Sequence, residues 1–170
     1  MKKMLVWLLL PLLLAGCGQP EDFETMSDIY EIPELPPAEP VTVYFPPEAA
    51  VEVMESPDGA KLYLCDGYSI AVQTFQGGDL KRTLQMATGY DDDKLVVMER
   101  KQDALDRYEC VWTAAGEGGD QVGRMVLLDD GNYHYTLTLM ANAETAGKLT
   151  DTWQEILGSF KLGREEPGKG

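Results

Sequence analysis

The pattern of apolar and polar residues divides the 170-residue chain into three parts. An apolar run from Met4 to Leu14, interrupted by Pro11, follows two lysines near the start. Residues 18 to about 40 are acidic and rich in proline, with no basic residue. Residues 41–162 then hold short apolar runs separated by Gly, Asp and Asn, a spacing typical of strands joined by turns. We therefore expect one folded domain at 41–162.

Eight segments of this domain predict β-strands, because their apolar residues alternate with polar ones or form short runs between turn signals. Asp66 and Gly67 separate two of them and predict a two-residue hairpin turn in which both central residues have positive φ. The last four segments follow one another closely and predict an antiparallel meander. The eight segments are 41–45, 50–54, 61–65, 68–75, 94–100, 106–114, 121–128 and 133–140.

Two further segments have the spacing of three and four residues that predicts helices. The first lies between Asp79 and Gly89, which are suited to cap its two ends. The second closes the domain over about 143–159, with Asn142 as its N-cap. Its apolar stripe requires a sheet to pack against, and consists of Ala146, Leu149, Trp153, Ile156, Leu157 and Phe160.

The order of these elements and the closing residues Trp153, Ile156, Ser159 and Phe160 resemble the PsbP-like family over about residues 60–162. The resemblance implies an α+β fold, in which helices pack on both faces of a central antiparallel sheet. It also implies a role in binding other proteins, and it transfers no catalytic residue.

The apolar run near the N-terminus is too short to span a membrane, since at about 1.5 Å per residue it covers roughly half of a hydrocarbon core about 30 Å thick. Its charged start and length are typical of an export signal. Leu14, Ala15, Gly16 and Cys17 resemble the lipobox of bacterial lipoproteins. The resemblance implies a signal peptide at 1–16 and an acylated Cys17; the alternative is a secretory signal with an incidental cysteine.

The net charge of the chain and its acidic segments indicate further properties. The net charge of -15 disfavours nucleic acid, because binding phosphates requires clustered Lys and Arg. We expect the acidic segment 17–40 to be an extended linker and residues 163–170 a disordered tail; the alternative for the linker is an acidic loop packed on the domain. A leader, an acidic tether and one such domain together resemble small lipoproteins of anaerobic Gram-positive bacteria.

Candidate chemistry is sparse. His134 lies in mid-strand on the polar face, where we expect a surface residue or a cross-strand partner. Asp91, Asp92 and Asp93 follow the first helix and lack the alternating pattern of a calcium loop, so we expect a solvated turn. No nucleophile elbow, paired His and Cys spacing or phosphate loop is present. We expect no metal and no cofactor.

Cys65 and Cys110 are the cysteines that remain besides Cys17. Both lie in predicted strands of an exported domain, where a disulfide is plausible. The alternative is two separate buried thiols, and the residues do not decide between them.

Together these features predict a non-enzymatic binding or adaptor domain, held by the lipid on Cys17 at the extracytoplasmic face of the cell membrane. Its partner would be an envelope protein or a small ligand. One alternative is an envelope hydrolase that uses Asp91, Asp92 and Asp93 with His134. The other is a structural surface protein.

Overall fold

A computed structural model describes residues 34–46, 52–57, 59–116 and 119–163. The predicted signal peptide 1–16, Cys17, the linker up to residue 33 and the tail from 164 onward lie outside the described residues. The domain belongs to the compact unit Pro36–Gly170. Within the described parts of the chain, no helix is long and apolar enough to cross a membrane.

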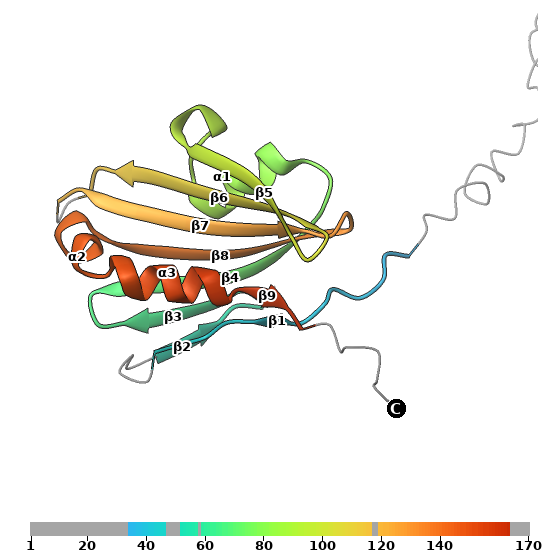
Figure 1. The fold of residues 1–170 in the computed structure, drawn as a ribbon, viewed down its shortest axis with the longest axis horizontal. Helices are drawn as coiled ribbons and strands as arrows, with labels where there is room; N and C mark the ends of the chain where they lie inside the picture. The colour runs from blue at the N-terminus through green and yellow to red at the C-terminus, as the bar shows by residue number, and fades with distance from the viewer. Residues whose placement is uncertain (1–33, 47–51, 58, 117–118, 164–170) are drawn as a thin grey trace, which may run out of the picture. The chain divides into compact units, whose positions relative to one another are not determined.

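A seven-stranded antiparallel sheet forms the centre of the domain, in the order β2-β3-β4-β8-β7-β6-β5 (Figure 1). The predicted meander is confirmed, and its four strands β5, β6, β7 and β8 form one side of this sheet. A separate antiparallel pair joins β1 to β9. The strands are β1 (Val41–Thr42), β2 (Glu52–Glu55), β3 (Lys61–Cys65), β4 (Tyr68–Gln76), β5 (Val96–Gln102), β6 (Leu105–Ala114), β7 (Gln121–Asp129), β8 (Tyr133–Asn142) and β9 (Lys161–Leu162).

Helices cover both faces of this sheet, which confirms the α+β class. One face packs against α2 (Ala143–Lys148) and α3 (Thr150–Ser159), which lie in front of the sheet in Figure 1. Every residue of the predicted apolar stripe takes part in this core, and Trp153 is 1% exposed. The other face packs against α1 (Leu80–Thr88) through a smaller core around Trp112. The three-residue 3-10 helix η2 (Asp92–Lys94) follows α1.

The caps of the helices agree with the sequence, whereas the closing helix does not run unbroken. The Asp79 side chain accepts a hydrogen bond from the Arg82 N–H, and Gly89 ends α1 with φ 79°. Asn142 caps α2 as predicted. The expected helix 143–159 is divided at Leu149 (φ -98°, ψ 10°), whose N–H bonds to the carbonyls of residues 145 and 146 together. This shared bond tightens the last turn of α2, so α3 starts anew.

The hairpin turns differ from the prediction in one respect. At the β3–β4 turn only Gly67 has positive φ (79°), so the expectation that Asp66 does so too is wrong. Two consecutive positive φ values occur instead between β5 and β6, at Asp103 (50°) and Ala104 (69°). Alanine seldom adopts this conformation, so its sequence did not signal the turn.

Part of the predicted linker belongs to the domain. The Glu39 N–H donates to the Tyr135 hydroxyl (2.9 Å), and the Tyr133 hydroxyl donates to the Pro36 carbonyl (2.8 Å). The Gly163 N–H donates to the Pro40 carbonyl (2.6 Å). Residues 36–40 are thus held by tyrosines of β8 and by the segment after β9.

Candidate functional site

His134 is buried between the sheet and α1, with 1% of its surface exposed. Its Nδ1 lies 2.7 Å from the Thr83 hydroxyl, and its Nε2 lies 3.4 Å from an oxygen of Asp129, the residue directly opposite it on β7. The expectation of a cross-strand partner is confirmed. The expectation of a surface residue is wrong, because α1 covers the face that the strand pattern marked as polar.

The three loop aspartates do not join His134. Asp91 accepts a hydrogen bond from the Gln85 side chain (2.8 Å), and Asp92 forms an exposed ion pair with Lys81 (2.8 Å) that lowers the pKa of Asp92. Asp93 is exposed in η2. The carboxylate beside His134 is Asp129, so the arrangement required by the hydrolase alternative is not assembled. Among the described residues, no group of His, Cys, Asp and Glu is suited to hold a metal ion.

The two cysteines of the domain are far apart, and both are free. Cys65 ends β3, and Cys110 lies in β6, with β4, β8 and β7 between these strands. Four inter-strand steps of about 4.8 Å put them on the order of 19 Å apart, whereas a disulfide joins Cα atoms within about 7 Å. The disulfide alternative is therefore wrong for this structure. Burial, followed by the charge of Glu109, raises the pKa of the Cys110 thiol to about 11.

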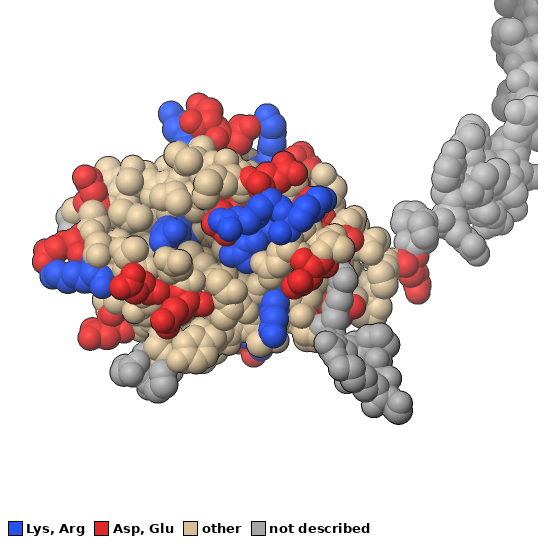
Figure 2. Space-filling view, viewed as in Figure 1, with Lys and Arg blue, Asp and Glu red and all other residues tan. Residues whose placement is uncertain are grey.

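A cavity of about 610 Å³ opens on the α3 face, over β5, β6 and β7 beside α3. We call it the arginine groove, because three of the five arginines of this acidic chain line it. Figure 2 shows basic side chains gathered on this face among scattered acidic ones. The charged and amide side chains that line the groove are Arg100, Lys101, Gln102, Arg107, Glu109, Arg124 and Gln154.

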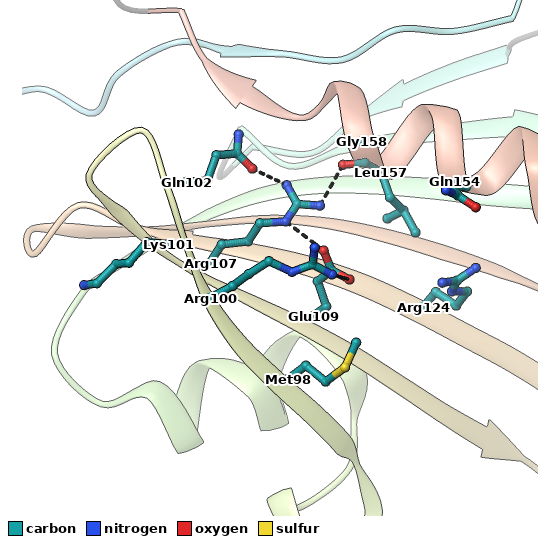
Figure 3. A pocket seen from close by; sticks show the side chains of 10 residues that line it. All are labelled: Met98, Arg100, Lys101, Gln102, Arg107, Glu109, Arg124, Gln154, Leu157 and Gly158. Atoms are coloured by element: carbon teal, nitrogen blue, oxygen red, sulfur yellow. Dashed lines mark hydrogen bonds and ion pairs between the residues drawn. The ribbon is translucent and has the colours of Figure 1, made fainter.

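The inner wall of the arginine groove is a closed network around Arg107, which is 6% exposed. Its guanidinium donates to Glu109 (2.9 Å), to the Gln102 side chain (2.5 Å) and to the Leu157 carbonyl (3.0 Å), as Figure 3 shows. The Gln102 amide also donates to the Phe160 carbonyl (3.1 Å). Because the last carbonyls of a helix lack partners within it, this network caps α3 and ties it to the β5–β6 hairpin.

The charges of the outer wall are less completely paired. Arg100 donates to the second oxygen of Glu109 (2.7 Å), so this one carboxylate serves two arginines. Lys101 pairs with Asp106, outside the groove. Arg124, on β7, is half-buried, and its guanidinium has no hydrogen bond or ion pair with any described residue. Figure 3 shows it apart from the Arg107 network.

A second cavity, of about 380 Å³, adjoins the first beneath α2 and the start of α3. We call it the apolar hollow, because its lining is mostly Val, Ala, Gly and Trp. It is lined by Val111, Val122, Ala146, Gly147, Thr150 and Trp153, together with Ala143 and Arg124. Arg124 is the residue that lines both cavities.

The sequence analysis did not identify either cavity. The available signal was the alternation of Met98, Arg100 and Gln102 in β5 and of Arg107, Glu109 and Val111 in β6. These positions face one side of the sheet, because residues two apart in a strand share a face. Charged residues on a face that also carries an apolar core predict an uncovered part of that face.

Comparison with known proteins shows similarity in structure but not in sequence. No protein-family model and no curated protein sequence matches the chain. A crystal structure from Bacteroides thetaiotaomicron matches 76% of this chain with 14% identity and a TM-score of 0.50, although the chain covers only 47% of that protein. LpqN of Mycobacterium tuberculosis, described as involved in cell envelope biogenesis, matches 75% of this chain and 85% of its own, with 10% identity and a TM-score of 0.50.

A third structure is the cyanobacterial PsbP of Synechocystis sp. PCC 6803, with 11% identity and a TM-score of 0.43 over 67% of this chain and 93% of that protein. At these identities the likenesses concern the fold alone.

Proposed function

We propose that the chain is a membrane-tethered extracytoplasmic lipoprotein whose domain binds a negatively charged partner of the cell envelope and performs no catalysis. The observation that carries this proposal is the arginine groove. Three arginines, one lysine and a single carboxylate line it, within a chain of net charge -15. Arg124 has no partner among the described residues, so the groove holds positive charge that the domain itself does not neutralise.

The burial of His134 supports a binding role over a hydrolytic one. His134 is enclosed by α1 and the sheet, and its nearby hydroxyl and carboxylate are those of Thr83 and Asp129. The groove, by contrast, is open and of a size that suits a small ligand or a side-chain cluster. Its arginines favour carboxylate and phosphate groups, which they bind in a bidentate manner.

The tether is proposed from the motif that ends at Cys17. Two or three acyl chains on this residue would hold the protein firmly, since each buried methylene contributes about 0.8 kcal/mol. Membranes of a strain expressing Cys17→Ala, washed with high salt, test this part. The variant should move to the soluble fraction, and retention on the washed membranes would contradict the lipid anchor.

The binding role is tested by capture from native envelope with the wild-type chain and with Arg124→Glu. A groove-dependent partner should be recovered in stoichiometric amount by the wild type and lost with Arg124→Glu. The matched control is Arg82→Glu, which makes the same charge change on the α1 face. Equal recovery by all three chains, or recovery of nothing, would contradict the proposed function.

A further inference from the structure

Arg124 occupies the junction between a polar and an apolar cavity. On one side lies the arginine groove, whose open wall carries Arg100. On the other lies the apolar hollow beneath α2. Arg124 lies on β7, opposite Val111 of β6 on one side and opposite Leu139 of β8 on the other. It therefore stands on the sheet face that carries both cavities. A molecule that enters both cavities must therefore pass this guanidinium.

The state of Arg124 indicates the charge of that molecule. A half-buried guanidinium has lost part of its hydration, and a charge in this position is normally compensated by an ion pair or hydrogen bonds. No described residue supplies one. The neighbouring cations are already engaged, since Arg107 and Arg100 share Glu109 and Lys101 pairs with Asp106. The site thus offers one free guanidinium, which matches one carboxylate or phosphate group.

The apolar hollow indicates the remainder of the molecule. In α2, Ala146 has only a methyl group and Gly147 has no side chain, which leaves the space over Val111 and Val122 open. A Cβ built on Gly147 would meet nothing within 4 Å. Trp153 lines the same hollow, and its indole N–H is buried without an acceptor among the described residues. An apolar lining with a few polar groups is the usual composition of a small-molecule site.

We propose, building on the binding role above, that the ligand is an amphiphilic anion. Its single carboxylate or phosphate group binds Arg124, its hydrocarbon arm lies in the apolar hollow, and any polar extension lies in the arginine groove toward Arg100. A strongly acidic peptide fits less well, because it would bring several carboxylates to a site with one unpaired arginine.

Titration calorimetry on the full-length chain carrying Cys17→Ala tests this proposal with defined probes. Decyl phosphate below its micelle concentration should bind with one site per chain. Inorganic phosphate, which lacks the arm, and decyl maltoside, which lacks the charge, should each bind at least about tenfold more weakly, because each forgoes an interaction worth about 1.4 kcal/mol or more. An equal affinity for decyl maltoside would overturn the role of the charge.

Two variants test separately where the anionic group and the hydrocarbon arm of the ligand bind. Arg124→Gln should weaken decyl phosphate binding at least about tenfold, because it removes a charge-assisted hydrogen bond. Gly147→Leu should fill the apolar hollow and abolish the advantage of decyl phosphate over inorganic phosphate. Arg82→Gln, an arginine of the opposite face, should bind as the parent chain does. Melting temperatures near that of the parent confirm that each variant is folded, and unchanged binding by folded Arg124→Gln and Gly147→Leu would overturn the site.

The source of the anion is resolved by vesicles of neutral lipid with and without phosphatidylglycerol. Binding to phosphatidylglycerol vesicles that depends on Arg124 assigns a lipid headgroup, whereas binding to monomeric decyl phosphate alone assigns a soluble amphiphile. Preference for a Glu-rich octapeptide over decyl phosphate would overturn the amphiphile and leave the proposed binding role intact. Loss of Arg124-dependent recovery from native envelope would instead contradict that role.

Discussion

Two halves of the same sheet face differ sharply in what covers them. Over β4 and β8, the pair α2 and α3 buries Ile70, Leu137 and Leu139 completely. Over β5 and β6, the face carries Arg100, Arg107 and Glu109, and Met98 is 54% exposed. The apolar stripe of the closing helices is only wide enough to cover one half. The other half is free to carry charge, and the domain can use it for recognition without loss of its core.

Arg107 marks the border between these halves. It stands on β6 in the charged half and donates to the Leu157 carbonyl at the end of α3. This hydrogen bond therefore joins the polar half to the helix that covers the apolar half. Two arginines of one cavity can thus have different roles, since the Arg107 guanidinium donates three hydrogen bonds and that of Arg124 donates none to the described residues.

In the covered half, Trp153→Ala should cause the largest loss of stability. This residue is 1% exposed at the centre of the α3 stripe, so its removal leaves a large cavity and should lower the free energy of unfolding by about 3–5 kcal/mol. Chemical denaturation measures the change. Glu155→Ala, an exposed position of the same helix, should change stability by less than about 0.5 kcal/mol. A Trp153→Ala melting temperature within a degree of wild type would contradict this packing.

At the border between the halves, Arg107→Gln should destabilise the domain somewhat less than Trp153→Ala does. The change removes one of the two arginines bound to Glu109, which keeps Arg100, and it removes the buried donor to the Leu157 carbonyl. We therefore expect a loss of about 2–4 kcal/mol in the free energy of unfolding.

Arg124→Gln provides the comparison for that variant, because it makes the same replacement in the same groove. Its guanidinium has no partner among the described residues, so stability should stay within about 0.5 kcal/mol of wild type. Denaturant midpoints of both variants check the difference. Equal destabilisation would show that the two arginines have the same structural role.

A loss of stability smaller than that of Arg107→Gln is expected at Tyr135, a buried residue of the covered half. Burial, with a hydrogen bond to Asp130, raises the pKa of its hydroxyl to about 12 from about 10 in the unfolded chain. The folded state retains a proton that the unfolded state releases, so the stability from this group is complete below pH 10 and is lost as pH rises toward 12.

Tyr135→Phe should therefore make stability fall less steeply between pH 10 and 12. It should also remove about 1 kcal/mol at neutral pH, through the lost bonds to Glu39 and Asp130. Urea midpoints at a series of pH values measure both effects. An unchanged alkaline slope would contradict the assigned role of this hydroxyl.

Local patterns in the sequence were sufficient for most of the fold. Alternation predicted the meander, and the spacing of the stripe from Ala146 to Phe160 predicted a closing helix on a sheet. Asp79, Gly89 and Asn142 predicted the caps, because capping depends on residues three or four apart. The contacts of residues 36–40 could not be predicted in this way, because the tyrosine hydroxyls that hold this segment are about 100 residues away in sequence.

The candidate site could not be predicted in the same way. His134 and the loop aspartates are the residues that chemical type singles out, yet the structure buries the former with Asp129 and leaves the latter at the surface. Arg107 and Arg124 looked like ordinary polar positions of strands. Their difference depends on whether a partner lies nearby, and those partners come from β5, β6 and α3.

The sequence by itself determined the periodicities, the turns and caps, and the charge of the chain, because these depend on neighbours within a few residues. It also contains the motif at Cys17 from which the tether is proposed. Only the tertiary structure decided which half of a sheet face α3 covers, that Cys65 and Cys110 lie apart, and that Arg124 stands unpaired between two cavities. Such relations arise when strands distant in sequence are brought side by side, and no local pattern encodes that distance.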